Sequence, residues 1–67
     1  MKLELEKHMA KRRMGIAKLA LKSELSETYI RELLDGKKSP TLRSVAKLAK
    51  ALDTTPKQLL PRRWEEE

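Results

Sequence analysis

The side chains with the clearest chemical potential lie in residues 26–36, SETYIRELLDG. Within this stretch Ile30, Leu33 and Leu34 follow the i, i+3, i+4 spacing of one buried helix face. The opposite face carries two carboxylates, one hydroxyl and one guanidinium, from Glu27, Thr28, Arg31 and Glu32. A carboxylate can accept a hydrogen bond from cytosine N4, and a guanidinium can donate to guanine O6 and N7. These four side chains therefore have the groups needed to contact base edges if the partner is a nucleic acid.

Two other interpretations of Glu27 and Glu32 stay open at this point. The face could be an ordinary solvated surface in which Arg31 pairs with a neighbouring carboxylate, without any role in binding. The carboxylates could also repel phosphates and so disfavour wrong sequences, which is compatible with base contact. Under that last interpretation, affinity has to come from the residues that flank the helix.

A basic segment, KKSP at 37–40, follows the expected helix. Hydroxyl and cationic side chains around it are expected to contact phosphates, and they are Ser26, Tyr29, Lys18, Lys37, Lys38, Ser39, Thr41 and Arg43. The N–H groups that open the helix after Thr41 would add an anion site. Each lysine alone is equally well explained by solubility, so the prediction depends on the cluster. With about six phosphates neutralised, log K should fall with log salt concentration at a slope of about −5.

The composition favours an anionic partner and gives no support for catalysis. The chain has 67 residues, and its 16 Lys and Arg against 10 Asp and Glu give a net charge of +6. It has no cysteine, and His8 is the one histidine, so neither a disulfide nor a zinc site is expected. There is no nucleophile–base pair and no glycine-rich phosphate loop. We expect no enzyme activity, no cofactor, no metal and no small-molecule substrate.

The longest apolar run also argues against a membrane partner. It is LAL at 19–21, far too short to cross a bilayer. The first residues, MKLELEKHM, lack the hydrophobic core of a signal peptide. We therefore expect a cytoplasmic protein that is not secreted.

The elements that must position these side chains are helices, since strand signals are nearly absent. The pattern predicts an all-α, compact five-helix bundle, with helices near 2–13, 16–22, 27–34, 42–51 and 56–60. Ser26, Thr41 and Thr55 are expected N-caps, and Gly36 an αL residue after the third helix. The inward face of the fourth helix is expected to hold Leu42, Val45, Leu48, Ala49 and Leu52.

From residue 14 to residue 60 the chain resembles the Cro and phage-repressor helix-turn-helix family. The matching segments are IAKLALKSELSETYIRELLDG, KKSP, TLRSVAKLAKAL and TTPKQLL. The resemblance implies a DNA-binding domain at 1–61, with the helix-turn-helix proper at 16–35 and a polar tail at 62–67. Helix 27–34 would then enter the major groove of double-stranded DNA in a protein of bacterial or phage type, and the positions that contact base edges in the family hold Glu27, Thr28, Arg31 and Glu32. Phage repressors bind palindromes as dimers, but no separate dimerisation domain follows Leu60, so we expect a monomer or a weak homodimer on DNA.

Two positions depart from this family, which commonly has glutamine at the start of the second helix and glycine in the turn. Here those positions hold Ile16 and Glu24. Ile16 removes one expected phosphate contact. Glu24 is expected to be forced towards positive φ, at a cost of about 1 kcal/mol.

The sequence leaves the role open between two classes. The first is a sequence-specific transcription regulator, or a designed DNA-binding module, because the Glu/Lys-rich surface and regular caps are also typical of engineered chains. The second is a protein-interaction module of the same fold, antitoxin-like or adaptor-like, with weak or no DNA specificity. Trp64 is expected to cover the core over the last helix, with a dimer contact as the alternative.

Overall fold

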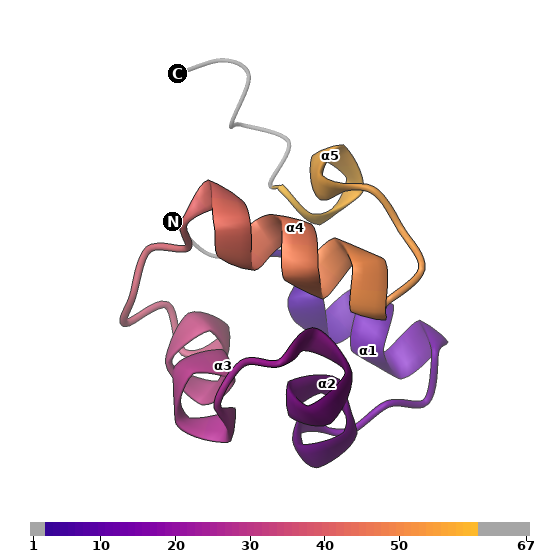
Figure 1. Cartoon of the computed structure of the whole chain (residues 1–67), viewed down its shortest axis with the longest axis horizontal. Coiled ribbons are helices and arrows are strands. Elements are labelled where there is room, and N and C mark those ends of the chain that lie inside the picture. Colours follow the sequence, from indigo (N-terminus) through magenta and orange to yellow (C-terminus); the bar gives the residue numbers. More distant parts are fainter. Residues whose placement is uncertain (1–2, 61–67) are drawn as a thin grey trace.

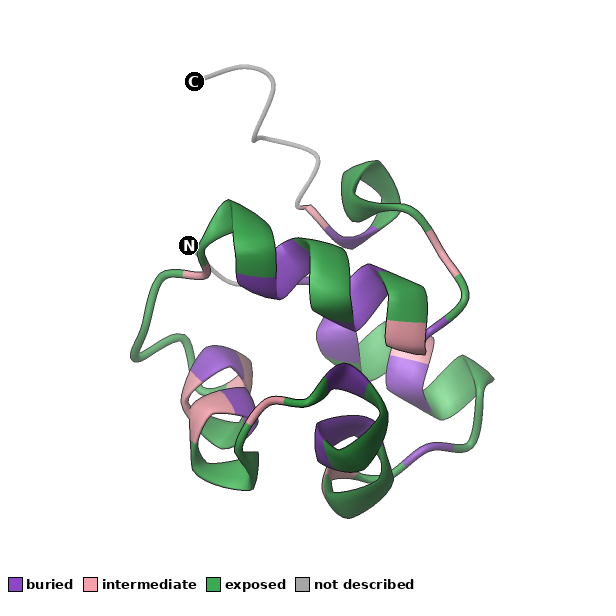
Figure 2. Cartoon of the chain, viewed as in Figure 1, coloured by how far each residue is buried: buried purple, intermediate pink, exposed green. Residues whose placement is uncertain are grey.

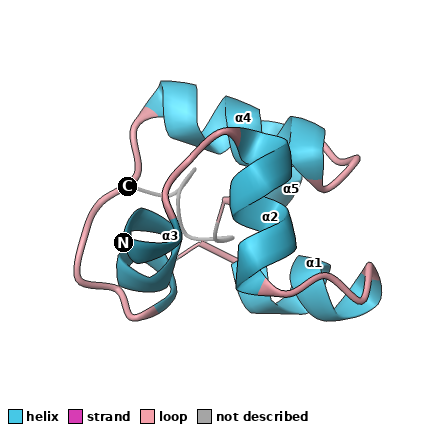
Figure 3. Cartoon of the chain, turned by 60° about the horizontal axis from the view of Figure 1, so that its bottom comes forward, coloured by secondary structure: helices cyan, strands magenta, loops and turns pink. Residues whose placement is uncertain are grey.

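The structure is a computed structural model that describes residues 3–60. Within that range the chain forms five helices and no strand (Figures 1 and 3). The helices are α1 (Leu5–Lys11), α2 (Ile16–Ser23), α3 (Glu27–Leu34), α4 (Leu42–Ala51) and α5 (Pro56–Leu59). This confirms the predicted all-α fold of five helices. The expected tail at 62–67, with Trp64, lies outside the described residues.

The starts of α3 and α4 follow the predicted capping. Ser26 Oγ accepts a hydrogen bond from the Tyr29 N–H at 3.0 Å. At α4, Thr41 Oγ1 accepts from the Ser44 N–H at 3.0 Å, and Ser44 Oγ accepts from the Thr41 N–H at 3.0 Å. These reciprocal bonds form a capping box. Thr55 is the N-cap of α5 without a side-chain hydrogen bond, and Pro56 occupies its first turn.

Helix α1 is shorter than the sequence pattern predicts. It begins at Leu5 rather than near residue 2, because Leu3 is buried and the Glu4 N–H donates to Leu59 O at 2.9 Å. The segment before α1 therefore docks on the end of α5 instead of extending the helix. At its other end α1 stops at Lys11, ahead of Arg13, which has φ +52°.

Each of the four longer helices is followed by a residue in the left-handed region. These residues are Arg13, Glu24, Gly36 and Asp53, with φ of +52°, +60°, +73° and +54°. After α3, the Gly36 N–H donates to Leu33 O at 3.2 Å, and the Lys37 N–H donates to Glu32 O at 2.9 Å. That pair of bonds is the Schellman motif, which satisfies the last carbonyls of the helix. Gly36 adopts this conformation freely, whereas the other three side chains are strained by it.

The core lies between α4 and the helices around it. Helix α4 packs against α2 and α5, and α2 packs against α3. The buried faces of these helices point towards one another, as the colouring in Figure 2 shows. The fully buried large side chains are all aliphatic, namely Leu5, Leu19, Ile30, Leu33, Leu48, Leu52 and Leu59.

Two predictions about buried positions need correction. The sequence pattern puts Leu42 on the inward face of α4, but this side chain is 80% exposed. Leu42 is the first residue of the helix, and the buried position of that first turn is taken by Ser44 instead. The pattern also puts Leu34 within the buried stripe of α3, whereas it is half-buried at the margin of the core.

Polar contacts connect α1 and its C-cap to the segment between Asp53 and Gln58. The half-buried His8 has Nε2 3.3 Å from Gln58 O. Arg12 donates to Asp53 O at 3.3 Å and lies 3.7 Å from the Asp53 carboxylate. The side chains of Arg12 and Asp53 are 44% and 89% exposed, so these contacts orient α1 and contribute little stability.

Candidate nucleic-acid interface

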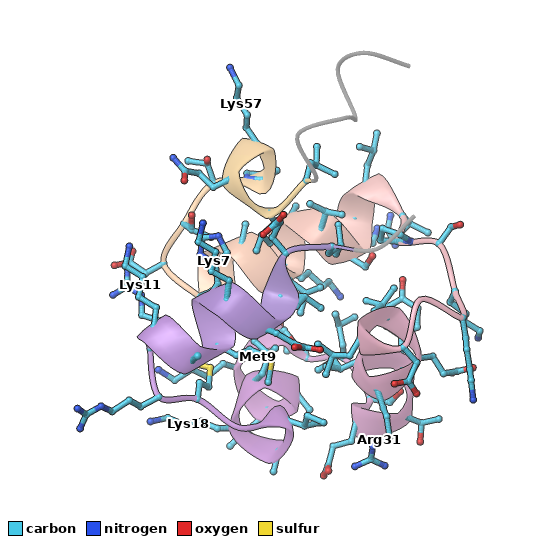
Figure 4. The ribbon with its side chains drawn as sticks, turned by 180° about the vertical axis from the view of Figure 1, so that it is seen from behind. Lys7, Met9, Lys11, Lys18, Arg31 and Lys57 are labelled. Carbon is cyan, nitrogen blue, oxygen red and sulfur yellow. The ribbon has the colours of Figure 1, made fainter. Side chains whose placement is uncertain are left out.

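The outward face of α3 is formed as its spacing predicts. Ile30 and Leu33 are buried in the core, which turns Glu27, Thr28 and Arg31 outward, and all three are exposed. Arg31 projects away from the body of the molecule in Figure 4. Three of the four residues predicted to contact bases therefore share one exposed face with hydrogen-bonding groups of both polarities.

Glu32, the fourth of these residues, has a different environment. Its side chain is 33% exposed, and its Oε1 lies 3.8 Å from the Nζ of Lys38. The same Nζ lies 5.9 Å from the centre of the Tyr29 ring, within the range of a cation–π contact. The structure thus brings together a predicted base-contacting residue and two predicted phosphate-contacting residues.

A hydrogen-bond network connects α3 to the start of α4. The Tyr29 hydroxyl donates to Ser44 Oγ at 2.9 Å, and Ser44 Oγ donates to Thr41 O at 2.9 Å. The hydroxyl proton of Tyr29 is therefore engaged, so a phosphate contact by Tyr29 requires this hydrogen bond to be exchanged. Thr41 Oγ1 only accepts in this network, which leaves its proton available to a phosphate.

Sequence reasoning did not identify Ser44 as part of the site. It is 4% exposed, and its hydroxyl makes one donated and two accepted hydrogen bonds. The signal that could have found it is the spacing of Thr41 and Ser44, which is that of an N-cap and the third residue of a helix. Ser44 acts on the interface through the α3–α4 loop that it closes.

The turn between α2 and α3 fixes how the two helices cross. Glu24 has φ +60° and ψ +31°, as expected for a non-glycine residue at this position, and the Leu25 N–H donates to Ala20 O at 3.2 Å. The buried Ser23 donates to Leu19 O at 2.7 Å, so its hydroxyl is satisfied within α2. Ile16 is half-buried against the core and offers no polar group where the family commonly has glutamine.

The remaining residues predicted to contact phosphates are exposed. On α2 this is Lys18, at the cap of α3 it is Ser26, and in the loop and first turn of α4 they are Lys37, Ser39 and Arg43. In Figure 4, Lys18 and Arg31 project from the same end of the molecule, while Lys57 projects from the opposite end. The exposed cations predicted to contact phosphates thus come from α2, from the α3–α4 loop and from the first turn of α4.

Other kinds of site find no support in residues 3–60. That part of the chain holds no group of three His, Asp or Glu side chains able to bind a metal ion. None of its helices is long and apolar enough to cross a membrane.

The sequence and the fold both match known proteins. Residues 4–62 match the pattern of the Cro/C1-type HTH DNA-binding domain. The restriction-modification controller protein C.AhdI from Aeromonas hydrophila is 28% identical, with a TM-score of 0.80 over 84% of this chain and 85% of that one. A chain of the SinR protein/SinI protein complex is 17% identical, with a TM-score of 0.82 over 94% of this chain and 62% of that one. No curated protein sequence matches the chain.

Proposed function

Because the chain belongs to the Cro/C1-type helix-turn-helix DNA-binding domain family, we propose that it reads double-stranded DNA sequence-specifically as a transcription regulator. The family binds DNA and is not enzymatic, which is in line with the lack of a catalytic constellation in the sequence. Helix α3 enters the major groove, and α2 crosses the backbone above it. The similarity to a restriction-modification controller protein supports a regulatory role.

The observation that carries this proposal is the outward face of α3. Glu27, Thr28 and Arg31 are exposed while Ile30 and Leu33 on the same helix are buried. Arg31 is the residue suited to guanine, because its guanidinium donates two parallel hydrogen bonds. Glu27 and Thr28 lie in the first turn, the part of a recognition helix that reaches base edges.

Affinity comes from residues around α3 that contact phosphates. Lys37, Ser39 and Arg43 lie in the α3–α4 loop and the first turn of α4, Lys18 lies on α2, and Ser26 caps α3; all five are exposed. Cations in these positions release counterions from the DNA, so binding weakens steeply with salt. The lysine-rich α3–α4 loop then provides affinity for DNA, and the carboxylates of α3 provide discrimination between base sequences.

We further propose a single DNA-binding domain at 1–61, with a polar tail at 62–67. The chain acts as a monomer or as a weak homodimer that forms on DNA. A pair of domains on a palindrome would place its half-sites about 10 base pairs apart, which is one turn of the DNA.

The experiment that tests the function is selection from a random pool of double-stranded DNA at about 150 mM salt, close to physiological ionic strength. A short enriched motif is the expected result, and its symmetry reports whether one or two copies bind. Absence of any enriched motif would contradict the proposal and favour the protein-interaction module, which a pull-down would then identify through its partner.

A further inference from the structure

Glu32 and Lys38 form a pair that is loosely held in the free protein. Their 3.8 Å separation is longer than a hydrogen bond, and the Lys38 side chain is 55% exposed. A partly exposed ion pair at this distance changes an equilibrium by about fivefold. The Tyr29 ring, 5.9 Å from the ammonium, adds an attraction of similar size. Lys38 is therefore positioned beside α3 without being fixed there.

A phosphate is a stronger partner for Lys38 than either of these. The ammonium has three donors and can form charge-assisted hydrogen bonds to a phosphate, whereas its 3.8 Å separation from Glu32 is too long for such a bond. Docking α3 in the major groove brings the α3–α4 loop to the DNA backbone. Lys38 then forms a contact with a phosphate and loses its ion pair with Glu32.

Glu32 is left in an unfavourable position by this exchange. Only 33% of its side chain is exposed in the free protein, and docking removes the water that remains around it. A carboxylate without a partner beside phosphates is penalised by more than the ion pair contributed. A cytosine N4 amino group can donate to the carboxylate and remove the penalty, whereas the acceptors of guanine and thymine cannot. Adenine also has an amino donor, but its N7 acceptor lies beside that donor and repels the carboxylate.

We propose that Glu32 and Lys38 are an exchange pair that makes a phosphate contact depend on a base. When DNA binds, the Lys38 ammonium moves from Glu32 to a backbone phosphate. This exchange is favourable where a cytosine amino group takes the place of Lys38 as the partner of Glu32. This inference rests on the proposed function and assigns one mechanism to two residues. Glu27, on the same helix, has no ion pair within residues 3–60 and takes no part in the exchange.

The test is a double-mutant cycle with Glu32→Gln, Lys38→Gln and the double variant. Dissociation constants are measured for the duplex selected by the wild type and for a scrambled duplex of the same composition. On the scrambled duplex, Glu32→Gln should raise the affinity for DNA. This increase should be about two- to fivefold larger when Lys38 is present than in the Lys38→Gln background. The matched cycle of Glu27→Gln with Lys38→Gln should be additive, because it makes the same change of charge at a position that has no ion pair with Lys38.

Selection from the random duplex pool with each single variant tests whether the exchange depends on the base that Glu32 contacts. Glu32→Gln should lose a cytosine preference at one position that Lys38→Gln keeps. Additive effects of Glu32→Gln and Lys38→Gln, or an unchanged motif for Glu32→Gln, would overturn the exchange pair and leave the proposed function intact. A wild-type chain that selects no motif would overturn both. Circular dichroism of each variant verifies that these substitutions leave the fold unchanged.

Discussion

The Tyr29 hydroxyl donates a 2.9 Å hydrogen bond to Ser44 Oγ, and this contact connects α3 to the first turn of α4. Ser44 donates its own proton to Thr41 O and also accepts from the Thr41 N–H, so both of its lone pairs and its proton are used. The loop that carries Lys37 and Lys38 is therefore closed at both ends by one buried hydroxyl. The placement of the loop cations depends on this closure.

Replacing Tyr29 with Phe tests that closure. The variant keeps the ring under Lys38 but removes the hydrogen bond to Ser44, which keeps its two contacts with Thr41. We expect the free energy of unfolding to fall by about 0.5–1.5 kcal/mol, the usual net value of one such bond. Urea denaturation followed by circular dichroism measures it. In a Ser44→Ala background the same substitution should have almost no effect, and an equal loss there would contradict the predicted coupling.

Glu24 offers a prediction of increased stability. It adopts φ +60° in the turn between α2 and α3, where a side chain costs about 1–2 kcal/mol relative to glycine. Glu24→Gly relieves that strain but makes the unfolded chain more flexible, so the net gain should be about 1 kcal/mol or less. Lys22→Gly, in the helical last turn of α2, is the control and should destabilise by about 1 kcal/mol. Thermal unfolding of both variants shows whether the change in stability comes from relief of left-handed strain at residue 24 or from a general effect of introducing glycine.

The parts of the fold that depend on local sequence were predictable. The cap at Ser26, the left-handed Gly36 and the buried pair Ile30 and Leu33 follow from residue type and helical spacing. Glu24 was also predictable, although only because the helix-turn-helix spacing marks its position as one that needs positive φ.

What the sequence could not predict depends on how the chain folds back on itself. Helix α1 starts late because Glu4 bonds to Leu59, and nothing near Glu4 in sequence indicates that contact. The Lys38 ammonium reaches Glu32 because the chain reverses after α3, which sets the geometry of the candidate site. The hydroxyl of the buried Ser44 is satisfied in part by Tyr29, a donor fifteen residues away.

Arg31 and Lys37 should affect DNA binding in different ways. Arg31 lies on the exposed face of α3, so Arg31→Ala should cost about 1–3 kcal/mol on the preferred duplex and relax the preference at one position. Lys37, exposed in the loop, should contribute alike to all sequences, and Lys37→Ala should reduce the salt slope by about 0.9. Binding isotherms at several salt concentrations, on selected and scrambled duplexes, separate the two effects. Base readout by α3 would be refuted if Arg31→Ala left both preference and affinity unchanged.

Leu42 and Leu48 lie on the same helix and test whether spacing or packing decides burial in α4. Leu42 is 80% exposed, and Leu48 is fully buried. Leu48→Ala leaves a cavity between α4 and its neighbours and should lower the free energy of unfolding by about 2–5 kcal/mol.

Leu42→Ala removes the same number of atoms from a position in contact with water, and it should change the free energy of unfolding by about 0.5 kcal/mol or less. Alanine also favours the helix slightly over leucine, which offsets part of any lost contact. Chemical denaturation of the two variants gives the comparison directly. A large loss for Leu42→Ala would mean that this side chain packs against the core after all, and that the first turn of α4 is buried by Leu42 as well as by Ser44.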